Sequence, residues 1–166
     1  MSGSSRPRAA AKMAIGAAVA ATAAAAVRGK LARFEIVENS MEPAMSAGDY
    51  VVAIATKSPL RGQIVVFPDP ILPARSLTKR VVGLAGETIT ITAGQVGIDG
   101  EILAEPWADG PTLPDGEWHC PPGTVFVLGD NRRLSSGDGR ALGPLRVESM
   151  YRVVFRYWPI GAIGRP

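Results

Sequence analysis

The chain has 166 residues, of which 46% are hydrophobic and 20% are charged, and this composition excludes a disordered chain and a membrane protein with many spans. Residues 1–33 carry six basic and no acidic side chains, so residues 34–166 carry the remaining 12 basic and 15 acidic ones, a net charge of −3. Because the positive charge is concentrated in the N-terminal segment, we expect no nucleic-acid partner.

The sequence contains one cysteine, Cys120, next to the one histidine, His119. A single cysteine excludes an internal disulfide and any zinc site built from several cysteines. A catalytic pair of these two neighbours is disfavoured, because adjacent residues on an extended chain point to opposite faces. We therefore expect no metal and no cofactor.

Residues 13–27, MAIGAAVAATAAAAV, are uncharged and rich in alanine, and with residues 9–12 they form a run of 19 residues interrupted by Lys12. A helix that spans a bilayer needs ~20 mostly apolar residues. A cleaved secretory signal and a soluble alanine-rich helix are the alternatives. We interpret residues 1–33 as a basic segment with one membrane-anchoring helix at about 9–27, in contact with lipid. Equal basic flanks leave its orientation open.

The sequence from Phe34 onward predicts short strands separated by Gly, Pro and Asp, and no stretch after Arg28 has a helical period. The predicted strands are RFEIVE, DYVVAIA, GQIVVFP, SLTKRVVGL, ETITITA, GQVGIDG, GTVFVLG and YRVVFRYWP. Residues 34–166 therefore predict a mainly β domain of folded antiparallel sheets or a partial barrel, preceded by one N-terminal helix. Residues 105–123 predict a loop or ribbon rich in Pro and Gly.

Ser40 lies in the segment VENSMEPAMSAGDYVVA, between two strand-like runs. A serine near turn-forming residues usually only stabilises the turn. A nucleophilic serine needs a base, and without a usable histidine the candidate is a lysine. Of four lysines, Lys79 lies inside an apolar strand, on one face with Leu77 and Val81. Burial there would lower the pKa of Lys79, whereas an edge-strand lysine would simply face water.

Four motifs in order support the catalytic interpretation, namely SMEP at 40–43, TKRVVGLAGE at 78–87, GDNRRLSSGDGR at 129–140 and LGPL at 142–145. Together they resemble the type I signal peptidases, the S26 serine endopeptidases with a Ser/Lys dyad. The resemblance covers roughly residues 34–159, and the anchor helix fits it. It implies a single-pass membrane enzyme with its catalytic domain on the extracytoplasmic side. Its substrates would be exported preproteins, from which it removes signal peptides by cutting after small residues.

The resemblance also implies roles for single residues. Ser40 would be the nucleophile and Lys79 the general base. Four residues would support them, with Met41 beneath the active site, Ser136 as the hydroxyl that orients the lysine, and Asp138 with Arg140 as an ion pair. The edges of a cleft that binds the substrate as an extra strand would be Ile36, Val37, Leu77 and Thr78.

Three positions depart from the family pattern. The loop 129–140 is one residue longer than usual, so Ser135 competes with Ser136 for the orienting role. Gly139 replaces a serine. Glu38 stands where some members carry a serine or glycine that helps to form the oxyanion hole, which leaves the second donor undetermined.

Two other functions stay open at this point. An inactive, membrane-tethered β domain could act as an adaptor. A repressor-type Ser/Lys autoprotease is the other alternative, although no Ala-Gly bond precedes Ser40.

Overall fold

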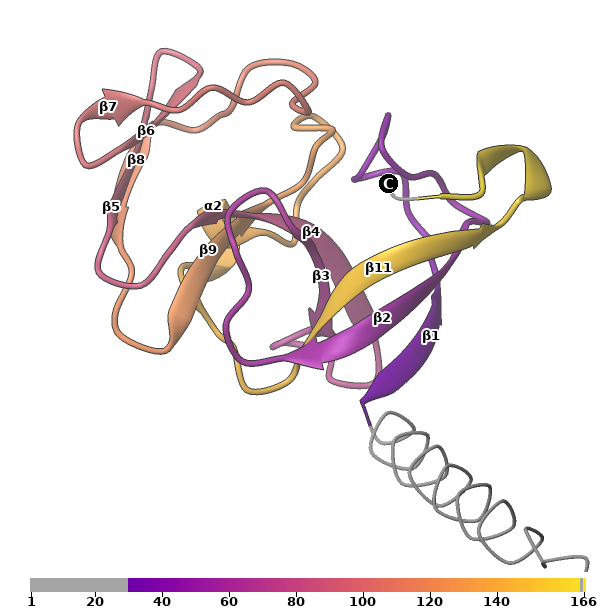
Figure 1. Ribbon diagram of the computed structural model, residues 1–166. Helices are drawn as coiled ribbons and strands as arrows, with labels where there is room; N and C mark the ends of the chain where they lie inside the picture. Colours follow the sequence, from indigo (N-terminus) through magenta and orange to yellow (C-terminus); the bar gives the residue numbers. More distant parts are fainter. Residues whose placement is uncertain (1–29, 165) are drawn as a thin grey trace, which may run out of the picture. The chain divides into compact units, whose positions relative to one another are not determined.

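The structure, a computed structural model, describes residues 30–164 and residue 166, and its strands form two sheets (Figure 1). The larger sheet has seven strands in the order β1-β2-β11-β3-β4-β9-β10, and the smaller has four in the order β7-β6-β5-β8. All the pairings among the ten strands from β2 to β11 are antiparallel. The expectation of a mainly β domain of antiparallel sheets is therefore confirmed.

The strand bounds follow the apolar runs of the sequence. The larger sheet consists of β1 (Leu31–Glu35), β2 (Tyr50–Thr56), β3 (Ile64–Pro68), β4 (Ser76–Gly83), β9 (Thr124–Leu128), β10 (Leu145–Arg146) and β11 (Met150–Trp158). The smaller sheet consists of β5 (Thr88–Thr92), β6 (Gln95–Ile98), β7 (Glu101–Ile102) and β8 (Gly116–His119). Strand β8 lies within residues 105–123 and pairs with β5.

Two short helices interrupt the strands, although none was expected after Arg28. Helix α2 (Gly139–Leu142) is one turn long, and η1 (Ile160–Ala162) is a 3-10 turn. A single turn is too short to show a helical period in the sequence. The Asp138 side chain caps α2 by accepting a hydrogen bond from the backbone N–H of Arg140. Capping therefore accounts for this turn where periodicity could not.

The anchor helix expected at residues 9–27 lies outside the described residues. Within residues 30–164, no helix has the length and apolar character needed to cross a membrane.

The central strands β4 and β9 are buried on both faces. Val81 of β4 and Val127 of β9 belong to one apolar cluster, together with Leu77 and residues of β3. Val82, the next residue of β4, belongs to a different cluster, which it shares with Phe126 and with Ile89 of the smaller sheet. Because successive side chains of a strand point to opposite faces, the smaller sheet packs on the second face of β4 and β9.

Substitution of Phe126 tests the packing of the smaller sheet on β4 and β9. Its side chain is fully buried, and its ring centroid lies 5.0 Å from that of Trp118. Phe126→Ala should reduce the free energy of unfolding by about 3–5 kcal/mol, because it leaves a cavity between the two sheets. Urea unfolding followed by tryptophan fluorescence measures the change. The exposed Leu60→Ala should change it by less than about 0.5 kcal/mol, and equal effects of the two variants would contradict the packing.

Candidate active site

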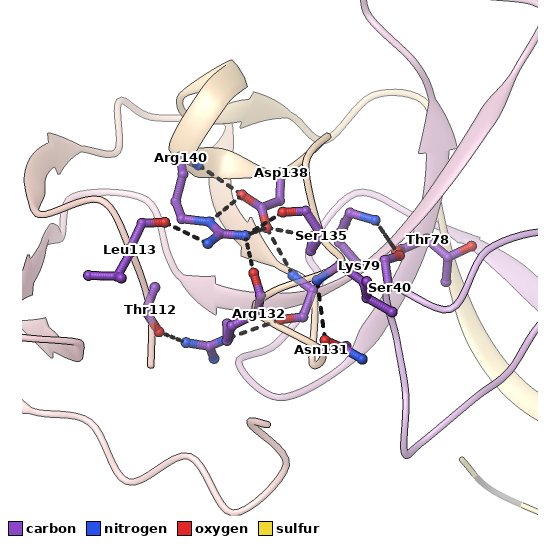
Figure 2. A network of polar contacts seen from close by, with 12 residues as sticks. Ser40, Thr78, Lys79, Thr112, Leu113, Asn131, Arg132, Ser135, Asp138 and Arg140 are labelled. Carbon is purple, nitrogen blue, oxygen red and sulfur yellow. Dashed lines mark hydrogen bonds and ion pairs between the residues drawn. The ribbon is translucent and has the colours of Figure 1, made fainter. Parts of the chain in front are cut away.

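The Ser40 hydroxyl and the Lys79 amine meet in the interior of the domain (Figure 2). Ser40 lies in the turn after β1, and Lys79 lies in the middle of β4. Lys79 Nζ is 2.7 Å from Ser40 Oγ and 3.0 Å from the carbonyl oxygen of Thr78. The two side chains come from positions 39 residues apart, and the residues are 3% and 1% exposed. The fold thus brings together the two residues expected to be nucleophile and base.

Burial lowers the pKa of Lys79 from its ordinary value, because the ammonium loses hydration in the interior. The nearby negative charges of Asp138 and Glu38 act against this shift, and the positive charges of Arg75 and Arg140 add to it. Desolvation is the largest effect, so the neutral form of the amine is populated at a lower pH than in an exposed lysine. A neutral amine can accept the hydroxyl proton of Ser40.

The turn that carries Ser40 is held by the loop 129–135. The backbone N–H of Asn131 donates to the carbonyl oxygen of Ser40 at 3.1 Å. Gly129 lies so close that a Cβ atom there would come within 2.6 Å of the same oxygen and 2.4 Å of Ser135 Cβ. Only glycine allows this approach. Met41, the next residue after Ser40, is fully buried and packs with Ile36 in the apolar cluster below the turn.

Asp138 and Arg140 form the expected ion pair. Arg140 contacts the carboxylate with two nitrogens, Nε at 3.0 Å and Nη2 at 2.8 Å. Burial acts to raise the pKa of Asp138, but the hydrogen bonds from Arg140 and Ser135 outweigh it, and the pKa is lowered. Arg140 also donates to the carbonyl oxygens of Leu113 and Ser135, at 2.7 and 2.6 Å. The pair therefore joins α2 to the loop before it.

The two candidate serines of this loop have different surroundings. Ser135 is buried, and its hydroxyl donates to Asp138 Oδ2 at 2.6 Å, whereas Ser136 is exposed. In the described part of the chain, the hydrogen bonds of Lys79 Nζ go to Ser40 and Thr78. The orienting role expected of Ser136 stays a prediction. The buried hydroxyl of this loop is that of Ser135, and it supports Asp138.

Sequence reasoning missed the two buried arginine–carboxylate pairs that Asp130 and Arg132 form beside this site. Arg80 binds Asp130 through Nε and Nη2, at 2.8 and 2.6 Å. Arg132 binds Glu105 through Nη1 and Nη2, at 3.2 and 2.6 Å, and its Nη1 also donates to Thr112. Burial raises the pKa of Asp130, and the hydrogen bond from Arg80 opposes this shift. An arginine in a strand buried on both faces was the signal that Arg80 needs a buried acidic partner.

The four residues expected at the cleft edges line one narrow cleft beside Ser40. Its two walls are the segment from Phe34 to Glu38 and the first residues of β4, Ser76 to Thr78, with Val66 between them. Residues 76–79 pair with β3 on one side, and the pairing of β4 with β9 begins only at Arg80. β1 is an edge strand. The cleft thus lies beside strand edges that can accept another strand.

Within residues 30–164, no group of three or more His, Cys, Asp or Glu side chains is arranged to hold a metal ion.

Comparison with known proteins gives consistent results. A family model described as signal peptidase, peptidase S26, matches residues 9–158. A signal peptidase I of Leptolyngbya laminosa is 34% identical over 144 residues, covering 78% of this chain and 70% of that protein. A probable signal peptidase I-2 of Synechocystis is 32% identical over 140 residues, covering 78% and 64%. A crystal structure of a signal peptidase I from Enterococcus faecalis matches with a TM-score of 0.52 and 29% identity, covering 59% of this chain and 97% of that chain.

These similarities define the chain as a serine endopeptidase. It belongs to the signal peptidase family, peptidase S26. The resemblance inferred from the four motifs is therefore confirmed.

Gly139, which departs from the family's serine, is explained by its surroundings. A Cβ atom at this position would lie 2.7 Å from the ring of Phe126. Gly139→Ser should therefore reduce the free energy of unfolding by about 1–3 kcal/mol through overpacking. The loss should shrink in a Phe126→Leu background, and urea unfolding of all four chains measures this coupling.

Gly161→Ser is the matched control, because a Cβ atom there has open space. Equal losses from Gly139→Ser in both backgrounds would show that the Phe126 ring is not the cause.

Proposed function

We propose that this enzyme removes signal peptides from exported preproteins, with Ser40 as nucleophile and Lys79 as general base. The observation that carries the proposal is the 2.7 Å contact between Ser40 Oγ and the buried Lys79 Nζ. The names of the relatives, signal peptidase I, give the substrate class. An inactive adaptor would have no use for a lysine in this position, because its burial is unfavourable.

The proposed reaction has two stages. Neutral Lys79 accepts the Ser40 proton while Oγ attacks the scissile carbonyl carbon, and the backbone N–H of Ser40 stabilises the resulting oxyanion. The Lys79 ammonium then donates its proton to the leaving amine, and an ester of Ser40 remains. Water, with Lys79 again as the base, hydrolyses this ester. No metal or cofactor is needed in either stage.

The cleft supports binding of the substrate as an extra strand. The backbone of residues 76–79 and the edge strand β1 can both form ladder hydrogen bonds with an extended peptide. Alternate side chains of that peptide would point between Ile36, Val37, Leu77 and Thr78. These four side chains crowd the space beside Ser40, which favours small substrate side chains there. This is the basis of the proposed cleavage after small residues.

The pH dependence of cleavage tests the role of Lys79. Its neutral form is the base, so kcat/KM should rise with pH through the lowered pKa of Lys79 and level off above it. Lys79→Arg and Ser40→Ala should each reduce kcat/KM for a labelled preprotein by at least about 1,000-fold, since a guanidinium stays protonated and alanine has no nucleophile.

The exposed Lys57→Arg is the control for the lysine substitution and should cleave at the parental rate. If Lys79→Arg also cleaved at a rate near that of the parent, Lys79 would not be the base.

We further propose that residues 9–27 anchor the enzyme in a membrane as a single-pass protein, with the catalytic domain on the extracytoplasmic side. The uncharged alanine-rich run between basic flanks supports the anchor. Exported preproteins reach that side of the membrane with their signal peptides attached, which supports the orientation.

Carbonate extraction tests the anchor. Full-length protein should stay in the membrane pellet, and a chain that starts at Lys30, and so keeps all of β1, should appear in the supernatant. Release of the full-length protein by carbonate would contradict the anchor.

A further inference from the structure

An ion pair joins the two walls of the cleft beside Ser40. Glu38, two residues before Ser40, lines the first wall, and Arg75 directly precedes Ser76, the first residue of the second wall. The Arg75 guanidinium donates to the Glu38 carboxylate across a separation of 37 residues in sequence. Their side chains are 43% and 45% exposed, whereas Ser40 is buried. The pair therefore lies on the solvent side of the cleft.

The cleft under this ion pair is too narrow for a peptide. Its volume is about 20 Å³, which is room for about one water molecule. A strand of substrate needs several times this space for its backbone and side chains. The second wall is fixed, since residues 76–80 are in register with β3. Ile36 is fixed as well, because it is buried and its backbone is hydrogen-bonded to Gly48 and Asp49. Val37 and Glu38 are exposed and lie outside any strand, so they are the part of the cleft that can move away.

The geometry points to Glu38 and Arg75 as the residues that control access of the peptide substrate to Ser40. While the ion pair is closed, the walls stay together, and the substrate binds only to the fraction of molecules in which it is open. This inference rests on the proposed function. Uncharged small residues near a cleavage site offer neither Glu38 nor Arg75 a new partner, so binding does not replace the lost contact.

The expected effect is modest and appears in KM. An exposed ion pair shifts an equilibrium by a factor of about 1.5–5, and salt weakens it. The apparent affinity of a substrate falls by the fraction of molecules that can bind it. Opening the pair permanently should therefore lower KM about two- to fivefold, with the same kcat when it is measured on the high-pH plateau, where Lys79 is neutral.

The test compares the detergent-solubilised full-length enzyme with E38Q and R75Q on a fluorogenic peptide that has small residues before the scissile bond. Both variants should lower KM by the stated factor. The parental KM should fall between about 0.05 and 1 M NaCl, and the variants should lose this salt dependence. The double exchange E38R/R75E should restore the parental KM. E148Q, which removes an exposed ion pair with Arg146, is the matched control and should leave KM unchanged.

A direct electrostatic effect on Lys79 would look different. Glu38 raises the pKa of Lys79 and Arg75 lowers it, so their removal should shift the pH profile in opposite directions. Control of access instead moves KM in the same direction in both variants. Opposite changes of KM, or an unchanged or raised KM in both, would overturn the inference.

The same comparison in an S40A background separates this inference from the proposed function. Fluorescence anisotropy of a labelled peptide reports affinity without cleavage, and E38Q and R75Q should again strengthen binding about two- to fivefold. Unchanged binding would overturn control of access even if the parent enzyme cleaves. If E38Q and R75Q strengthen binding in the S40A background but the parent enzyme does not cleave the peptide, the inference stands and only the proposed function is contradicted.

Discussion

The burial of one lysine is the constraint on which the rest of the structure depends. Lys79 is among the largest side chains that are fully buried, and its ammonium form loses hydration there. The lysine is buried because β4 packs on both faces, with Val81 in one apolar cluster and Val82 in the other. Asp138 and Glu38 favour the charged form, yet desolvation outweighs them. Packing of the sheets, rather than a dedicated partner, therefore lowers the pKa of this amine.

Three arginine–carboxylate pairs fix the loop that supports Ser40. Each pair has two contacts. Asp130 and Arg132 bind partners outside the loop, Arg80 and Glu105, and Asp138 binds Arg140 within residues 130–140. Pairs of buried charges add little net stability, because desolvation offsets their attraction, but planar two-point contacts restrict geometry. The restricted loop presents the Asn131 N–H to the Ser40 carbonyl oxygen. The position of Ser40 is thus set by a loop outside its own turn.

The sequence allowed the fold class to be predicted, because alternating apolar runs between turn residues predict strands without knowledge of their partners. The burial of Lys79 could also be expected from the sequence, since this lysine lies on one strand face with apolar residues. The pairs of Arg80 and Arg132 were not, because their acidic partners lie 50 and 27 residues away and depend on how the strands meet. The sequence left the choice between Ser135 and Ser136 open for a similar reason. It depends on the close approach of Gly129, which brings Ser135 inward.

The departures from the family pattern bear on whether the domain is active. Gly139 has the Phe126 ring where a serine side chain would lie, and Glu38 has Arg75 as a partner for its charge. Each departure is therefore accommodated by its neighbours, and neither removes an atom from the Ser40–Lys79 contact. A domain that served only as an adaptor would be more stable with an apolar side chain at position 79, because the lysine is held in the interior against its hydration. The cost of burying this lysine therefore favours the proposed catalytic role of Lys79 over an adaptor without activity.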